Sequence, residues 1–298
     1  MKNLALCLLF CTTVFAQSEG TIESAGSKLF YRTFGNGKPL LIINGGPGMN
    51  SDGFISLAEK LAVDNMTIAY DQRGTGKSTV ENLNSSTITM DLMVLDIENL
   101  RQHLGIKKWV VLGHSFGGML ASYYATIHPT RIEKLILSSS GGIDLDLLSY
   151  VETRTNEKLS TVERDSLDYY NQKLKSGDTS YAVRIGRGRA LAPAYVYRKK
   201  NIQIIAERLT QENSTLNSLV WQNLHKIKFN VAEKVKDFEQ KVLIIQGKND
   251  IVDMATAEKI QKAFKNSSLV RLDKCGHYGW LDRPEQYFVE ISKFLNSI

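Results

Sequence analysis

Residues 109–118 of the chain read Trp-Val-Val-Leu-Gly-His-Ser-Phe-Gly-Gly. The first four are apolar and mostly β-branched or aromatic, which predicts a short buried strand. The residues after the glycines carry a helical pattern that stops at Pro129. Ser115 therefore lies on a tight turn between a strand and a helix, where Gly113 and Gly117 lack the Cβ atoms that would clash as the two elements meet. This context predicts a serine held on a strained turn and presented as a nucleophile.

The composition is that of an ordinary globular chain. It has 298 residues, of which 43% are hydrophobic and 23% charged, enough for one large core or two modest ones. The absence of low-complexity tracts and short-period repeats in the sequence argues against a disordered protein and against a solenoid. The formal net charge is +6, and basic residues gather only between positions 184 and 200. No nucleic-acid-binding motif accompanies this basic stretch, so we expect a solvated face and no nucleic-acid partner.

The first sixteen residues differ from the rest. Lys2 precedes an almost wholly apolar run, and residues 14–16, Val-Phe-Ala, resemble a small-x-small cleavage site. The apolar run is shorter than the ~20 residues that span a bilayer. We therefore expect a signal peptide at 1–16, cleaved after Ala16, and an exported protein that is not attached to a membrane. The alternatives are an uncleaved anchor and, less favoured because bulky Phe10 precedes the cysteine, a lipoprotein acylated at Cys11.

Cleavage would remove two of the three cysteines, Cys7 and Cys11. The remaining Cys275 would have no partner for an internal disulfide, so the exported protein would depend on its core for stability. Cys275 lies two positions before His277, a spacing that gives no particular alignment. We expect it to be a small packing residue.

Strand and helix patterns alternate along most of the chain. An alternating strand is predicted at 28–34, and continuous apolar strands at 40–43, 66–70, 109–112, 135–137, 242–245 and 269–272. Helices are predicted at 51–62, 88–104, 119–127, 255–264 and 284–295. This alternation predicts an α/β fold with a mostly parallel central sheet and helices on both faces.

The segment 143–239 has a different texture. Helical patterns dominate it, and no clear buried strand appears. We interpret it as a helical cap inserted into a core formed by residues 17–142 and 240–298.

Two glycine-containing turns follow predicted strands. The first, Asn44-Gly45-Gly46-Pro47-Gly48, would let backbone N–H groups point into a cavity, as an oxyanion hole requires; a plain tight turn is the alternative. The second, residues 71–78, ends in Gly76-Lys77-Ser78 as a phosphate-binding P-loop does. It has Asp71 where that motif needs its first glycine, and no phosphate-binding helix follows, so we expect a structural loop.

Ser115, Asp250 and His277 each follow the carboxyl end of a predicted strand. In open α/β sheets this edge carries the ligand crevice. Serine is a poor nucleophile until a base takes its proton, which His277 would do, while Asp250 would orient the imidazole and stabilise its charged form. Asp253 is the alternative acid, three residues further from the strand. This chemistry requires no metal and no cofactor.

The order serine, aspartate, histidine is that of the α/β-hydrolase triad, and the chain resembles that fold family. Within the family it is similar to the proline iminopeptidase group of serine peptidases. The resemblance covers roughly residues 28–140 and 241–298 and rests on Gly45-Gly46-Pro47-Gly48, Asp71-Gln72-Arg73-Gly74-x-Gly76-x-Ser78, Gly113-His114-Ser115-Phe116-Gly117-Gly118, Gln246-Gly247-x-x-Asp250 and Gly276-His277. It implies that the backbone N–H groups of Gly46 and Phe116 form the oxyanion hole.

The chain also departs from that group. Asn44 stands where the group usually has histidine, and Phe116 stands where its aminopeptidases typically have tryptophan. Those aminopeptidases hold the amino terminus of the substrate with glutamates in the cap, a role that Glu207 or Glu212 would take here. The cationic segment Arg198-Lys199-Lys200 follows an aromatic stretch similar to theirs, and it would repel an ammonium group.

Three functions follow as hypotheses. The first is a secreted serine aminopeptidase that releases N-terminal proline or another residue from short peptides. The second keeps the triad but cleaves a small ester or lactone, including an anionic one attracted by the cap arginines. The third is a ligand-binding homologue without turnover, which an intact serine, histidine and aspartate argue against. Dehalogenase and epoxide hydrolase activity are disfavoured because those relatives use a carboxylate nucleophile.

Overall fold

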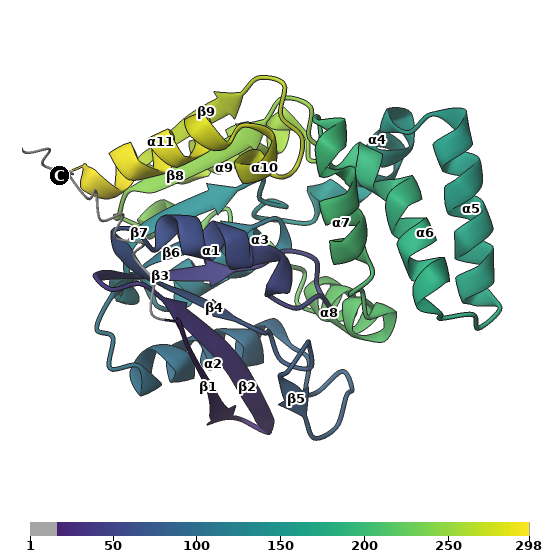
Figure 1. Cartoon of the computed structure of the whole chain (residues 1–298). Coiled ribbons are helices and arrows are strands. Elements are labelled where there is room, and N and C mark those ends of the chain that lie inside the picture. Colours follow the sequence, from purple (N-terminus) through teal and green to yellow (C-terminus); the bar gives the residue numbers. More distant parts are fainter. Residues whose placement is uncertain (1–16, 298) are drawn as a thin grey trace, which may run out of the picture.

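A central sheet organises the computed structural model, which describes residues 17–297 (Figure 1). The predicted signal peptide at 1–16 lies outside the described residues. Within them the sheet has nine strands: β1 (Gln17–Ser24), β2 (Ser27–Phe34), β3 (Lys38–Ile43), β4 (Asn65–Tyr70), β5 (Thr79–Val80), β6 (Trp109–His114), β7 (Ile132–Ser138), β8 (Val242–Gly247) and β9 (Ser267–Leu272).

The sheet is mostly parallel, as predicted. The spatial order is β1-β2-β4-β3-β6-β7-β8-β9, with β5 paired to β2. All neighbours from β4 to β9 pair in parallel, whereas β1, β2 and β5 pair antiparallel. The carboxyl ends of β6 and β8, which precede Ser115 and Asp250, therefore open on the same edge of the sheet.

Helices cover both faces of this sheet. Alternate residues of β3, such as Leu41 and Leu40, enter two separate apolar clusters because successive side chains of a strand point to opposite faces. One cluster contains α2 (Met90–His103), α3 (Phe116–Ile127) and α9 (Met254–Ala263). The other contains α1 (Ile55–Leu61), α10 (Gly279–Asp282) and α11 (Pro284–Asn296). In residues 17–297, no helix combines the length and the apolar character needed to cross a membrane.

Five further helices follow β7 and precede β8 in the sequence, and they lie at the carboxyl end of the sheet (Figure 1). They are α4 (Val151–Lys158), α5 (Thr161–Lys175), α6 (Tyr181–Leu191), α7 (Ile202–Leu209) and α8 (Ser214–Lys226), here called the cap helices. After α8 the chain returns to the sheet. Four apolar residues of this stretch pack in the cluster of α2, α3 and α9: Phe229, Val231, Val235 and Phe238. The last ten residues or so of the segment interpreted as cap thus help to form the core.

The predicted strands and helices are confirmed to within a few residues, but β1 and β5 were not expected. β1 carries polar residues such as Glu19 and Glu23 and is largely exposed, so its sequence lacks the apolar pattern of a buried strand. It is held by antiparallel pairing with β2 over its full length.

The loop at 71–78 is a structural element. Arg73 is fully buried and makes two hydrogen bonds to the carboxylate of Asp96 on α2, of 2.8 and 2.6 Å. The Asp71 carboxylate accepts hydrogen bonds from the backbone of Ser51 and Lys77. Arg73 and Asp71 therefore hold this loop against α2 and the loop after β3.

Candidate active site

Ser115 occupies a sharp turn between β6 and α3. Its φ of 55° and ψ of −121° are unfavourable for a residue with a Cβ atom, and such strain is of the order of 1–3 kcal/mol. A Cβ atom on Gly117 would lie 2.1 Å from the carbonyl oxygen of Ile43, and one on Gly113 would lie 2.3 Å from that of Gly117. The two glycines are needed because strand and helix approach so closely. Ser115 itself is half-buried and lines a pocket.

His277 and Asp250 are joined by a hydrogen bond of 2.8 Å between Nδ1 and Oδ1. Both residues are buried, and Asp250 also accepts hydrogen bonds from the Val252 backbone and from Nε2 of Gln246. With Nδ1 engaged by the carboxylate, Nε2 of His277 is the nitrogen free to exchange a proton. His277 lines the same pocket as Ser115.

Asp253, the alternative acid, lies elsewhere. Its carboxylate accepts a hydrogen bond from the Ala255 backbone at the start of α9 and pairs with Arg154 at 2.8 Å. Asp253 caps a helix, and the imidazole of His277 is bonded to Asp250.

The residues proposed for the oxyanion hole also line this pocket. Gly46 lies in the turn after β3, and Phe116 is the first residue of α3. Across the described part of the chain, neither the Gly46 N–H nor the Phe116 N–H donates a hydrogen bond to a protein group. Both donors are available to an oxygen atom in the pocket.

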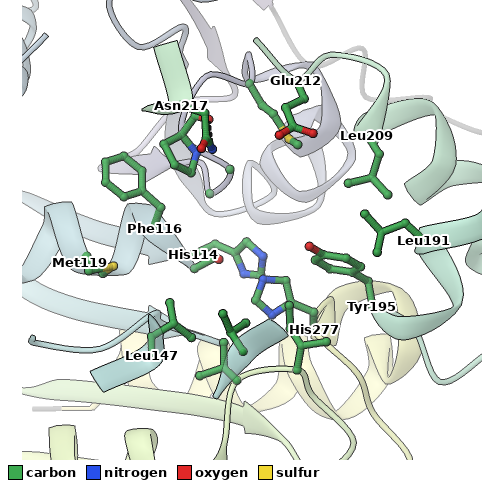
Figure 2. Close-up of a pocket in the computed structure, with 18 of the residues that line it drawn as sticks. His114, Phe116, Met119, Leu147, Leu191, Tyr195, Leu209, Glu212, Asn217 and His277 are labelled. Carbon is green, nitrogen blue, oxygen red and sulfur yellow. Dashed lines mark hydrogen bonds between the residues drawn. The ribbon is translucent and has the colours of Figure 1, made fainter. Parts of the chain in front are cut away.

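The pocket has a volume of about 220 Å³. Drug-sized ligands occupy sites of roughly 300–1,000 Å³, so this space suits a single residue or a small acyl group. Its walls combine core and cap residues, and Figure 2 shows the imidazoles of His114 and His277 side by side, with the Tyr195 hydroxyl near them. The apolar part of the lining includes Phe116, Met119, Leu147, Leu191, Leu209 and Trp221.

Two opposite charges from the cap face the pocket. Glu212 lines it, and Arg187 of α6 pairs with the Glu212 carboxylate at 2.8 Å. Glu207, the other candidate from the sequence, is exposed to solvent and bonded to the Tyr181 hydroxyl. The segment Arg198-Lys199-Lys200 does not contribute to the pocket lining among the described residues. The cation beside the pocket is Arg187.

His114 lies between aromatic rings at the pocket floor. Its ring centroid is 4.6 Å from that of His277 and 4.9 Å from that of Trp280. Neither of its nitrogens has a hydrogen-bond partner within 3.5 Å among residues 17–297. Burial, with the charges of His277 and Arg208 nearby, lowers the pKa of His114 well below its usual value. His114 is therefore a neutral packing residue.

Sequence reasoning did not identify Arg187, Tyr195 or Asn217 as pocket residues. Arg187 was only part of a basic run, and Asn217 carries no motif. Tyr195 belongs to the aromatic stretch 194–197, and its carbonyl accepts a hydrogen bond of 2.7 Å from the His277 backbone. That stretch was the one available signal.

Comparisons with known proteins identify relatives in sequence and in fold. The chain is 29% identical over 294 residues to a proline iminopeptidase of Lactobacillus crispatus, covering 93% of this chain and 98% of the relative. Its fold is similar to that of a proline iminopeptidase of Mycobacterium smegmatis, with a TM-score of 0.71 at 21% identity over 93% of this chain and 97% of the other. It is also similar to an esterase of Exiguobacterium antarcticum, with a TM-score of 0.70 at 20% identity over 93% and 99% of the two chains.

The resemblance stated from the sequence is confirmed by these relatives, and the hydrolase assignment agrees with them. The sequence model of the alpha/beta hydrolase fold matches residues 38–284, which is most of the chain and includes Ser115, Asp250 and His277. The protein belongs to the α/β-hydrolase fold family.

Proposed function

We propose that the protein is a serine aminopeptidase that releases an N-terminal residue, proline above all, from short peptides. The observation that supports it most is the 2.8 Å hydrogen bond between His277 and Asp250, in a pocket that Ser115 also lines. Relatives named proline iminopeptidases, aligned over 93% of the chain, supply the substrate class.

In the proposed reaction, Ser115 Oγ attacks the carbonyl carbon of the first peptide bond. His277 Nε2 takes the serine proton and then gives it to the leaving amine, and Asp250 stabilises the imidazolium between these steps. Water then hydrolyses the acyl-enzyme by the same route. The backbone N–H groups of Gly46 and Phe116 would hold the oxyanion, each worth about 3–4 kcal/mol of transition-state stabilisation.

Glu212 is the proposed partner of the substrate ammonium group. One of its oxygens is bonded to Arg187, which leaves the other for a free amino terminus. A substrate with an acylated amino group would lose this interaction, and its uncharged amide would face the Glu212 carboxylate. The proposal therefore predicts a requirement for a free N-terminus.

A second candidate, hydrolysis of a small anionic ester or lactone, is favoured by Arg187. This arginine lines the pocket and would attract a substrate carboxylate. The two candidate functions share the nucleophile Ser115 and differ in the charge of the substrate group that the pocket binds.

The test compares para-nitroanilides of proline and of N-acetylproline with para-nitrophenyl esters of neutral and dicarboxylic acids. If the protein is an aminopeptidase, it should cleave the free proline anilide at neutral to mildly alkaline pH and reject the acetylated one. Cleavage of esters without any anilide would favour the second candidate. A fluorophosphonate label should react with the wild type and not with Ser115→Ala, which should retain the fold and lose turnover. Absence of both labelling and turnover in the wild type would favour a ligand-binding homologue.

We also propose that residues 1–16 are removed during export. Mass spectrometry of the protein recovered outside the cytoplasm should find Gln17 at its amino terminus. Recovery of the full-length chain in the cytoplasmic fraction would contradict export.

A further inference from the structure

Arg208 is a buried cation in the interface between cap and core. It belongs to α7 and is only 3% exposed. Its Nη2 donates a hydrogen bond of 2.8 Å to the carbonyl oxygen of Gly45, and its Nε donates one of 3.3 Å to the Tyr278 hydroxyl. A longer contact of 3.5 Å reaches the Asn50 carbonyl, and the guanidinium lies 4.6 Å from the centre of the Phe54 ring.

The partners of this guanidinium are all neutral. Burying an unpaired charge costs several kcal/mol unless hydrogen bonds and aromatic faces compensate for lost water. Arg208 lies on the buried side of α7 with Ile205 and Leu209, where packing alone would be served by an apolar residue. The contact with Gly45 is the shortest that Arg208 makes, and it points to a role in the turn that follows β3.

A trans peptide is planar, and its C=O and N–H groups point in opposite directions. Fixing the oxygen of Gly45 therefore fixes the N–H of Gly46, because both belong to one peptide unit. The same oxygen accepts a second hydrogen bond, of 3.1 Å, from Nδ2 of Asn44.

We infer that Arg208 is a positioning residue for the oxyanion hole: it holds the Gly45–Gly46 peptide so that the Gly46 N–H faces the pocket. This inference rests on the proposed function, in which that N–H binds the oxyanion. Arg208 does not line the pocket among the described residues, so it acts through the peptide. Its positive charge also polarises the peptide along the direction in which the oxyanion forms, an effect that is strong where water is excluded.

Other cap groups hold the same turn. Asn217 of α8 donates a hydrogen bond of 2.9 Å to the Pro47 carbonyl, and the Asn213 backbone donates one of 3.2 Å to the Gly48 carbonyl. Three carbonyls of the turn thus accept hydrogen bonds from the cap. Arg208 differs from the other two donors because it carries a charge and engages the peptide that includes the Gly46 N–H.

The test is Arg208→Met, which keeps much of the side-chain volume and removes the charge and the donors. Steady-state kinetics with the proline anilide should show kcat lowered by ~10–100-fold, less than the loss of an oxyanion donor itself, with KM changed little. The dissociation constant of a proline boronic acid, which forms a tetrahedral adduct with Ser115, should rise by a similar factor. Inhibition by free proline should stay unchanged. Arg208→Lys, which restores a charged donor, should recover part of the loss.

Arg189→Met is the matched control, because Arg189 is an exposed arginine of the neighbouring cap helix α6, bonded to Gln203. It should leave all constants unchanged. If Arg208→Met does not fold, Asn44→Ala removes the second donor to the same oxygen and should lower kcat while circular dichroism stays native. A wild-type kcat in folded Arg208→Met, or equal weakening of boronate and proline binding, would overturn the inference. If Arg208→Met does not fold, an unchanged kcat in Asn44→Ala would overturn it.

Failure of the proposed function has a different signature. If the wild type cleaves esters but no anilide, the peptidase is wrong, and the same variants compared on the ester still test Arg208. If the wild type cleaves neither, the inference falls with the proposed function.

Discussion

The two sides of the candidate site are held by different parts of the molecule. Ser115 is fixed by the core alone: its N–H donates to the Ser138 carbonyl of β7, and its own carbonyl accepts from Gly118 and Gly141. The turn at 45–48 and the loop of His277 are also held by the cap, through Arg208 and through the Tyr195 carbonyl. The cap is therefore more than a wall of the pocket. The hydrogen bonds that fix the Ser115 backbone come from the core, whereas the His277 loop and the Gly45–Gly46 peptide form hydrogen bonds with both core and cap.

Asp250→Asn should have the largest effect, on the core side of this comparison. An amide in place of the carboxylate would set a donor against Nε2 of Gln246 or against Nδ1 of His277, which favours the wrong imidazole tautomer. We expect kcat to fall by up to ~10⁴-fold with the fold retained. Asp253→Asn, on the same loop, is the control and should keep near-normal turnover. A larger loss in the control would reinstate Asp253 as the acid.

Asp282→Asn should disturb the cap side. The buried Asp282 carboxylate accepts hydrogen bonds from the backbone of Gly276, next to His277, and from the backbone of Tyr197 and Arg198 in the cap segment. An amide would turn one donor toward these N–H groups. We expect a loss of about 2–4 kcal/mol in the free energy of unfolding, measured by denaturant titration, with reduced kcat. Exposed Asp273→Asn should change neither, and a native-like Asp282→Asn would show that the two segments hold each other by other contacts.

His114→Phe should alter the pH dependence of stability. The folded pKa of His114 lies below the unfolded value near 6.5, so below that pH the unfolded chain binds a proton that the folded chain does not. Stability is lost as pH falls, by up to about 1.4 kcal/mol per pH unit from this residue. In denaturant titrations at several pH values, His114→Phe should reduce the slope of the free energy of unfolding against pH. His225→Phe, at an exposed position, should leave that slope unchanged. An unchanged slope in His114→Phe would mean that His114 is protonated in the folded protein.

The smallest effect concerns Cys275, which is fully buried beside the His277 loop. Burial also raises the pKa of its thiol, so little reactive thiolate forms. The native wild type and Cys275→Ala should therefore release the same amount of chromophore with a disulfide reagent, and differ by one thiol in guanidinium chloride. A difference under native conditions would indicate that this loop opens.

The core, and the proximity of Asp250 to His277, could be predicted from the sequence. The carboxyl ends of parallel strands lie at one edge of the sheet for any conformation of the loops between them. The sequence did not allow prediction of which cap residues enter the pocket. Arg208 and Gly45 are 163 positions apart, and their contact depends on how the cap helices settle on the core. One signal was present: Arg208 lies three residues after Ile205, on the buried side of α7, where a charged residue is unexpected. Arg187 was visible only as part of a basic run, and Glu212 only as one of two candidate glutamates, so their pairing needed the structure.

The hydrogen bonds from the cap to the turn at 45–48 set a condition for redesigning this protein. A chimera that received the cap of a relative would gain new pocket walls but lose the donors to Gly45, Pro47 and Gly48 unless the graft supplied them. Under the proposed function, substrate preference and catalytic competence are therefore coupled through these hydrogen bonds. Successful exchange of the cap would require that an equivalent of Arg208 travel with it.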